Sequence, residues 1–234
     1  MLIRDRSITD TLEKQEEVEV TAKLDTDSLA NATRYFNFVS YSILAGCVYV
    51  IAVILASFRE TKIEKRTVIS STNYKKYNRE LFLSNGILAI ILWLLYYLLS
   101  IILLGKTMFT MHGLLYLINS LVFTFCALAL AFLISTIVNN KNAINGIVNV
   151  VALGSSFLCG AFVPMEWLPN SVLKIAHLLP TYYYIKSNEL LTKIEVFNLE
   201  TLKPILLNMV IILIFMILFV VITNMISRSK RKIG

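Results

Sequence analysis

Residues that could make or break covalent bonds are few in this chain and stand far apart. The two histidines, His112 and His177, are isolated, and neither G-x-S-x-G nor H-E-x-x-H occurs. Nucleophilic catalysis needs a nucleophile beside a base, and metal catalysis needs clustered ligands. The three cysteines, Cys47, Cys126 and Cys159, are odd in number and form no C-x-x-C. The sequence therefore predicts no enzyme, no metal site and no cofactor, and it assigns the cysteines to packing.

A second short motif, Gly105-Lys106-Thr107, matches the end of a phosphate-binding P-loop. The complete motif needs another glycine five residues before Gly105, and Ser100 occupies that position. A strand should also precede the loop, and none is predicted here. The motif is therefore rejected, and any ATP is expected to bind to another subunit.

Apolar residues dominate the chain in long runs, at 57% of 234 residues. Five windows exceed the roughly 18 residues that a helix needs to cross a bilayer. None of them contains Asp, Glu, Lys, Arg or His. The sequence thus predicts an all-α membrane protein, a polytopic bundle of five transmembrane helices. The expected transmembrane domain is 36–226, with spans at about 36–57, 81–104, 113–138, 144–165 and 204–226.

Basic residues are distributed unevenly between the segments that join these spans. Segments 58–80, 139–143 and 227–234 carry 12 of the 22 Lys and Arg residues in 36 positions, and the other connecting segments carry 10 in 81 positions. Cytoplasmic segments are enriched in Lys and Arg. We therefore expect a multi-pass protein of the cell membrane with its N-terminus outside and a basic cytoplasmic tail at 227–234. No soluble basic face with interleaved aromatics exists, which argues against nucleic acid as a partner.

Two polar segments flank the first span. Residues 1–35 are acidic and polar, and we expect an extracytoplasmic segment that is an edge strand, a short helix or disordered. Residues 58–80 fit a short amphipathic helix along the membrane followed by a turn. An ordinary solvated basic loop fits the same residues equally well.

The start of the fourth span is rich in asparagine. Asn145 and Asn149 are four residues apart and therefore share one helical face. Amides in a bilayer are expected to turn toward protein, where they can form hydrogen bonds between helices. Ser156 and Gly160 form a small-xxx-small step that permits close packing.

Residues 159–184 contain three of the four prolines and a triple tyrosine. Proline breaks or kinks a helix that reaches it, so the fourth span should break near Pro164. Residues 170–179 fit one short amphipathic helix, and the tyrosines after Pro180 suit the headgroup level. We expect a helix–break–helix element that enters or rests on the outer leaflet, or else an interfacial loop with an aromatic belt. His177 is expected to cap or pack the short helix.

The order of these residues resembles the permease subunit of ABC-2 type transporters. The family pattern is a glycine, Phe/Ile-x-Pro, hydrophobic-Pro, an apolar helix, and a further proline followed by aromatics. It is matched by Gly160, Phe162, Pro164, Trp167-Leu168-Pro169, Ile175, Leu179-Pro180 and Tyr182. The basic segment also resembles the family stretch that meets the ATPase, through Glu60, Arg66, Ser70 and Ser71. The resemblance covers roughly residues 36–226.

The resemblance implies an exporter subunit that forms the translocation pathway and is driven by a separate ATP-binding subunit. It also implies a second permease subunit, identical or different. Glu60, Arg66, Ser70 and Ser71 would contact the ATPase. An outer gate or re-entrant element would comprise Gly160, Pro164, Trp167, Pro169, Pro180 and Tyr182. Family members usually have six spans, so we expect this chain to lack the counterpart of the first.

An ATP-independent secondary transporter or channel subunit is the alternative. Such proteins generally carry ionisable residues inside the membrane to move protons or ions. The five predicted spans contain none. A pump whose energy enters from outside the bilayer fits this pattern better.

Overall fold

The computed structural model describes residues 27–58, 74–138 and 140–233. Every regular element in these residues is helical. The first helix runs from Asp27 to Phe58 and contains a π-helical segment, η1 (Ile43–Cys47), followed by α2 (Val48–Phe58). The remaining elements are α4 (Tyr74–Leu104), η2 (Gly105–Phe109), α5 (Met111–Ile137), α6 (Lys141–Leu158), η3 (Met165–Trp167), α7 (Asn170–Ala176), α8 (Pro180–Thr192) and α9 (Leu199–Ile233).

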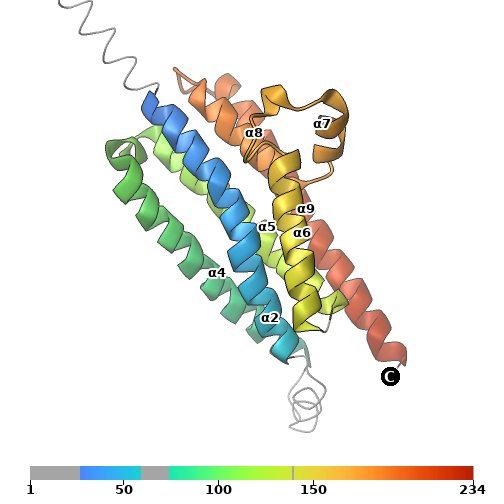
Figure 1. The fold of residues 1–234 in the computed structure, drawn as a ribbon. Coiled ribbons are helices and arrows are strands. Elements are labelled where there is room, and N and C mark those ends of the chain that lie inside the picture. The colour runs from blue at the N-terminus through green and yellow to red at the C-terminus, as the bar shows by residue number, and fades with distance from the viewer. Residues whose placement is uncertain (1–26, 59–73, 139, 234) are drawn as a thin grey trace, which may run out of the picture.

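The long helices alternate in direction through one bundle (Figure 1). The first helix, α5 and α9 run toward the end where α2 stops and α4 begins, which we call the α2–α4 end. α4 and α6 run back toward the opposite end, where η3, α7 and α8 lie. We call this opposite end the hairpin end. Asp27 and Ile233 therefore lie at opposite ends of the bundle.

Four helices are long and apolar enough to cross a membrane, namely Asp27–Phe58, Glu80–Phe109, Met111–Ile137 and Leu199–Ser227. They correspond to four of the five expected spans, and all four start earlier in the sequence than the expected windows do. The remaining one, the fourth expected span, was placed wrongly at its C-terminal end. It was expected to reach residue 165, but α6 ends at Leu158 and its apolar part, Asn142–Leu158, is shorter than the others.

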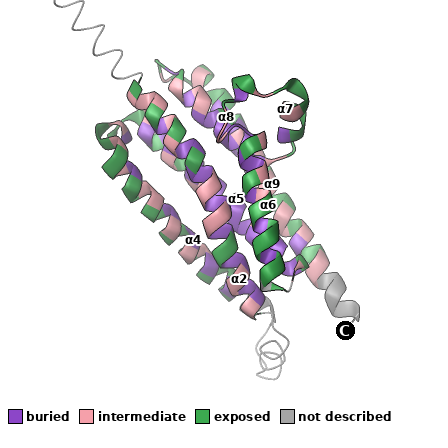
Figure 2. Ribbon diagram, in the orientation of Figure 1, coloured by how far each residue is buried: buried purple, intermediate pink, exposed green. Residues whose placement is uncertain are grey.

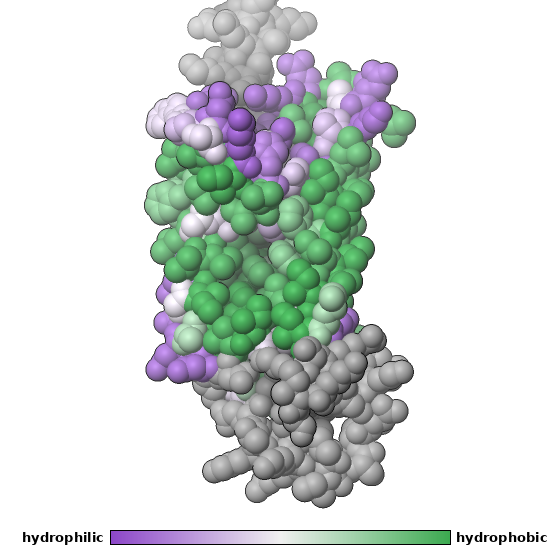
Figure 3. Space-filling view, turned by 90° about the vertical axis from the view of Figure 1, so that its right-hand side faces the viewer, coloured by the Kyte–Doolittle hydropathy of each residue, from purple (hydrophilic) through white to green (hydrophobic). Residues whose placement is uncertain are grey.

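α5 is the central helix of the bundle and contacts the first helix, α4, α8 and α9. The apolar windows of α5 and the first helix are 56% and 50% buried, whereas those of α4 and α9 are only 17% and 22% buried. α4 and α9 thus present most of their apolar surface outward (Figure 2). Apolar residues cover the middle of the face seen in Figure 3, and polar residues gather toward the hairpin end. Such an apolar band suits contact with lipid.

The cysteines lie in this core, as expected from the sequence. Cys47, Cys126 and Cys159 are free thiols with 2%, 1% and 0% of their surface exposed. All three belong to the large apolar cluster that joins the first helix, α5 and α6. Burial of a free thiol in apolar surroundings makes it a small hydrophobic packing residue.

Candidate functional site: the helical hairpin and its cavity

Gly160 ends the fourth helix and turns the chain. Its φ is +96°, and an added Cβ would lie 2.6 Å from Met165 Cγ. Only glycine adopts such a backbone without strain. The helix therefore stops at Leu158, six residues before Pro164, where the sequence pattern had placed the break.

The prolines in this stretch begin helices. Pro164 precedes η3, Pro169 precedes α7, and Pro180 is in the first turn of α8. Proline is tolerated at these positions because the first N–H groups of a helix lack a partner within it. The expectation that proline kinks the fourth span is therefore wrong, and these residues set the starts of three successive short helices.

α8 is packed within the bundle near the hairpin end and runs antiparallel to α5. Thr192 is paired with Tyr116, Asn188 with Asn119, and the Tyr184 ring stacks on Phe123 at a centroid distance of 4.6 Å. Phe123 lies twelve residues after Met111, which corresponds to a depth of about 18 Å along α5. The chain after α6 thus returns deep into the bundle and climbs back to the hairpin end as α8.

Polar side chains fasten α8 on two sides. Asn188 Nδ2 donates to Asn37 Oδ1 at 3.0 Å, and Asn119 Nδ2 donates to Asn188 Oδ1 at 2.8 Å. Asn188 thereby joins the first helix to α5 through α8. One turn nearer the end, the Thr33 hydroxyl contacts those of Tyr116 and Thr192. We call these six residues, Thr33, Asn37, Tyr116, Asn119, Asn188 and Thr192, the polar ladder.

The tyrosines after Pro180 do not form the expected headgroup belt. Tyr182 and Tyr184 are 5% and 0% exposed, and the Tyr184 hydroxyl donates to the Phe36 carbonyl oxygen at 2.8 Å. A buried tyrosine hydroxyl needs such a partner, and a backbone carbonyl on the first helix supplies it. His177 ends α7 as expected, with Nδ1 2.6 Å from the Leu173 carbonyl oxygen.

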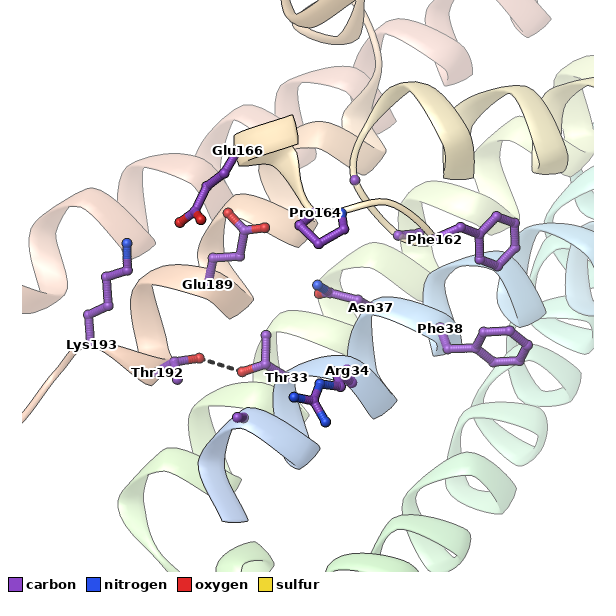
Figure 4. Close-up of a pocket in the computed structure, with 13 residues that line it drawn as sticks. Thr33, Arg34, Asn37, Phe38, Phe162, Pro164, Glu166, Glu189, Thr192 and Lys193 are labelled. Atoms are coloured by element: carbon purple, nitrogen blue, oxygen red, sulfur yellow. Dashed lines mark hydrogen bonds between the residues drawn. The ribbon is translucent and has the colours of Figure 1, made fainter. Parts of the chain in front are cut away.

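A cavity of about 700 Å³ opens between the first helix, the 160–166 loop and α8 (Figure 4). Its walls carry both signs of charge, aromatic rings and an amide. The lining includes Arg34, Asn37, Phe38, Phe162, Glu166, Glu189 and Lys193, together with Gly160 and Pro164. In Figure 4 the carboxylates of Glu166 and Glu189 turn toward each other across the α8 side of the cavity.

Burial raises the pKa of Glu189 above its ordinary value, and the nearby negative charge of Glu166 adds to the effect. The positive charges of Lys193 and Lys186 and a hydrogen bond with the Met165 backbone act in the opposite direction. Burial dominates because a charged carboxylate loses solvation there. Glu189 thus ties α8 to the start of η3 while facing the cavity.

The residues expected to form the outer gate are distributed over this element. Gly160 and Pro164 line the cavity, Pro180 and Tyr182 are buried in α8, and Trp167 is 77% exposed. Pro169 is also exposed, at the start of α7. The expected ATPase contacts, Glu60, Arg66, Ser70 and Ser71, and the expected amphipathic helix lie outside the described residues.

Several residues of this site were missed by sequence reasoning. Asn37 and Asn119 are polar amides inside apolar spans. This signal could have indicated polar contacts between helices. Arg34, Glu166 and Glu189 carried no signal, because isolated charges near span ends are common. Within the described residues no group of three His, Cys, Asp or Glu side chains could hold a metal ion. The charged, amide and aromatic side chains that line the cavity can bind a ligand.

Comparison with known proteins agrees with this architecture. Neither a curated protein nor a solved structure matches the chain. A family model described as an ABC-2 family transporter protein matches residues 5–224. The match covers nearly the whole sequence, including the bundle, the hairpin end and the cavity. The chain therefore belongs to the ABC-2 family of transporter proteins and is a multi-pass membrane protein.

Proposed function

We propose that this chain is the membrane-spanning permease subunit of an ATP-driven exporter, powered by a separate ATP-binding subunit. Family membership over residues 5–224 is the observation that carries the proposal. The chain sits in the cell membrane with the hairpin end outside and the α2–α4 end facing the cytoplasm. The ATP-binding subunit docks at the α2–α4 end through segment 58–80, with Glu60, Arg66, Ser70 and Ser71 in contact.

The absence of charged residues from the spans supports transport that is driven by energy supplied outside the bilayer. Moving an ion or proton through a bilayer usually requires ionisable side chains within it. The apolar windows of all five crossing segments lack such side chains. ATP hydrolysis on a partner removes that need, because the partner moves the helices mechanically.

An exposed polar face on α6 supports pairing with a second permease subunit. Asn149 Nδ2 donates to Asn145 Oδ1 at 3.3 Å, and both side chains are exposed. The expectation that this face meets protein is not met by the described residues. Amides facing lipid are costly, so a second subunit or an aqueous pathway between two subunits should cover the face. We therefore place the translocation pathway beside α6.

Purification of the tagged chain from native membranes tests whether a separate ATP-binding subunit is present. We expect an ATP-binding-cassette ATPase to co-purify, identified by mass spectrometry, and the complex to hydrolyse ATP. Glu60→Ala combined with Arg66→Ala should remove the ATPase from the complex. Glu200→Ala combined with Lys203→Ala is the matched control, because that pair lies on α9 at the hairpin end. If the complex survives in the first double variant, segment 58–80 is not the docking site. If no ATPase co-purifies, the proposed separate ATP-binding subunit is refuted.

Cysteine cross-linking tests the second subunit. In a chain without its native cysteines, Asn149→Cys should form a dimer on treatment with a short bifunctional thiol reagent. Ile91→Cys is the control, because Ile91 is 55% exposed on the lipid-facing helix α4. Equal cross-linking at both positions, or none at Asn149→Cys, contradicts pairing through α6.

A further inference from the structure

The first helix presents hydrogen-bond donors to the cavity. Asn37 is only 7% exposed, and its Oδ1 is occupied by Asn188. Its Nδ2 has no partner among the described residues and points into the cavity (Figure 4). Arg34 lies one turn away on the same face, and only its Nη1 is engaged, with Asn31 Oδ1 at 3.1 Å. An amide donor that faces a cavity can donate to a ligand or to water there.

The opposite wall presents acceptors. Glu189 on α8 and Glu166 in η3 face each other, and each negative charge disfavours the other. The positive charges of Lys193 and Lys186 act against this repulsion at Glu189. Lys193 lies one turn beyond Glu189 at the end of α8 and also lines the cavity. A positive group placed between the two carboxylates would relieve their repulsion.

An aromatic wall extends from the cavity along the first helix into the apolar region. Phe38 and Tyr41 lie 5.8 Å and 5.2 Å from Phe162 by ring centroid, and Phe157 lies 5.1 Å from it. Phe38 remains 54% exposed beside the cavity. This surface is suited to an apolar chain that lies at membrane depth while its polar end occupies the cavity.

We propose that the cavity binds the headgroup of a zwitterionic amphiphile, an amine-bearing phospholipid of the leaflet at the hairpin end. The anionic phosphate faces Arg34 and Asn37, the ammonium faces Glu166 and Glu189, and the acyl chains lie along Phe38 and Phe162. The placement of Arg34 and Asn37 on one wall and of Glu166 and Glu189 on the facing wall favours a ligand with both charges over a simple cation or anion. Binding of this kind goes beyond the proposed transport role and does not depend on it.

Native mass spectrometry of the detergent-purified full chain tests the proposal. The probes are dioleoyl phosphatidylethanolamine, dioleoyl phosphatidylglycerol and dodecylamine. We expect phosphatidylethanolamine to bind tightest, because phosphatidylglycerol lacks the ammonium and dodecylamine lacks the phosphate. Free phosphoethanolamine distinguishes the sources of the headgroup. If it competes only weakly, the ligand is a membrane lipid. If it binds as tightly as phosphatidylethanolamine, the cavity takes a soluble zwitterion and the proposal of a lipid ligand is overturned.

Charge-neutralising variants locate the binding. Arg34→Gln and Glu189→Gln should each weaken phosphatidylethanolamine binding by about tenfold, since each removes one charge-assisted hydrogen bond. Arg34→Gln should leave dodecylamine binding unchanged, whereas Glu189→Gln should weaken it. Lys174→Gln and Glu195→Gln are matched controls, because both residues are exposed and neither lines the cavity.

Glu166→Gln keeps the proposal falsifiable if Glu189→Gln fails to fold. Glu166 is exposed at the edge of the cavity, so its replacement should preserve folding and still weaken binding of the amine. Unchanged lipid binding in Arg34→Gln and Glu166→Gln, or equal loss in the two controls, overturns the assignment.

Discussion

At the scale of single residues, Gly160 controls where the fourth helix stops and where the hairpin begins. Its positive φ and the closeness of Met165 leave no space for a side chain. Every residue that follows, including the cavity wall from Gly160 to Glu166, depends on this turn. A backbone requirement of this kind is local, yet it decides the position of a whole element.

Gly160→Ala should destabilise the chain by about 1–3 kcal/mol, because alanine is strained at this φ and its Cβ would displace Met165. Thermal unfolding in detergent measures the effect. Gly154→Ala is the matched control, since no atom lies within 4 Å of the Cβ it would add. The control should be neutral or stabilising, as alanine favours helix more than glycine does. Equal melting temperatures for Gly160→Ala and the wild type contradict the prediction.

Glu189 should make stability depend on pH. Burial raises its pKa in the folded state, so the folded chain holds the proton more tightly than the unfolded chain. The resulting stabilisation is present below the ordinary glutamate pKa and is lost as the pH rises above about 4.3 through the raised folded pKa.

Glu189→Gln imitates the neutral acid and should remove this dependence. The melting temperature of the wild type should therefore fall relative to Glu189→Gln as the pH is raised from about 4 to about 7. The melting temperature of Glu195→Gln, a variant in the exposed loop after α8, should change with pH in the same way as that of the wild type. Parallel curves for Glu189→Gln and the wild type would show that the carboxyl is not desolvated.

At the scale of elements, α8 is held by contacts with two helices that are distant in the sequence. Asn188 joins Asn37 and Asn119 through hydrogen bonds of 3.0 Å and 2.8 Å. Asn119 Nδ2 also donates to the Tyr184 carbonyl oxygen at 3.0 Å, which adds a contact with the α8 backbone. The polar ladder therefore positions α8, and with it Glu189 and the cavity.

Asn188→Ala should cost about 1–2 kcal/mol of unfolding free energy, because it breaks two interhelical hydrogen bonds and leaves the buried Asn37 Oδ1 without its donor. Asn142→Ala, which removes an exposed amide from α6, should cost much less. Thermal unfolding in detergent compares the two. A larger loss in Asn142→Ala would mean that the ladder does not hold α8.

The prolines of the hairpin act at the same scale. Pro164 and Pro169 precede η3 and α7 without being inside a helix. Pro164→Ala combined with Pro169→Ala should therefore leave insertion and expression close to wild type while reducing transport, because the loop loses its fixed geometry. Membrane-fraction yield and a cellular efflux assay separate the two effects. Lost membrane integration would assign these prolines to folding alone.

At the scale of the whole molecule, four helices are long and apolar enough to cross a membrane, and the shorter α6 runs beside them. The first helix begins at the hairpin end, and α9 ends at the α2–α4 end. Basic residues concentrate in the segments at the latter end. This distribution favours a cytoplasmic α2–α4 end.

Impermeant thiol labelling of intact cells should therefore modify Glu195→Cys, in the exposed loop after α8. A tag placed after residue 234 should react with antibody only after permeabilisation. The native cysteines are buried and should contribute little background. Labelling of the tag in intact cells, with protection of Glu195→Cys, would invert the proposed orientation and remove the proposed docking side for the ATPase.

The sequence by itself determined the helical class and the approximate position of each crossing segment. Long runs without a charge can satisfy their backbone groups in lipid only as helices, so composition alone was sufficient there. The end of the fourth span was misplaced, because the pattern gave weight to proline and the positive φ at Gly160 is invisible in composition.

Only the tertiary structure decided where α8 lies and which residues share the cavity. α8 contains Lys186 and Glu189 and is thirteen residues long, so its composition resembles that of a surface helix. Its burial results from amides and hydroxyls on helices more than 60 residues away in sequence, at Asn37, Asn119 and Tyr116. Local patterns record what one segment prefers on average. Side-chain pairing between distant segments depends on their packing in three dimensions, and here that packing buries a polar helix and forms the cavity beside it.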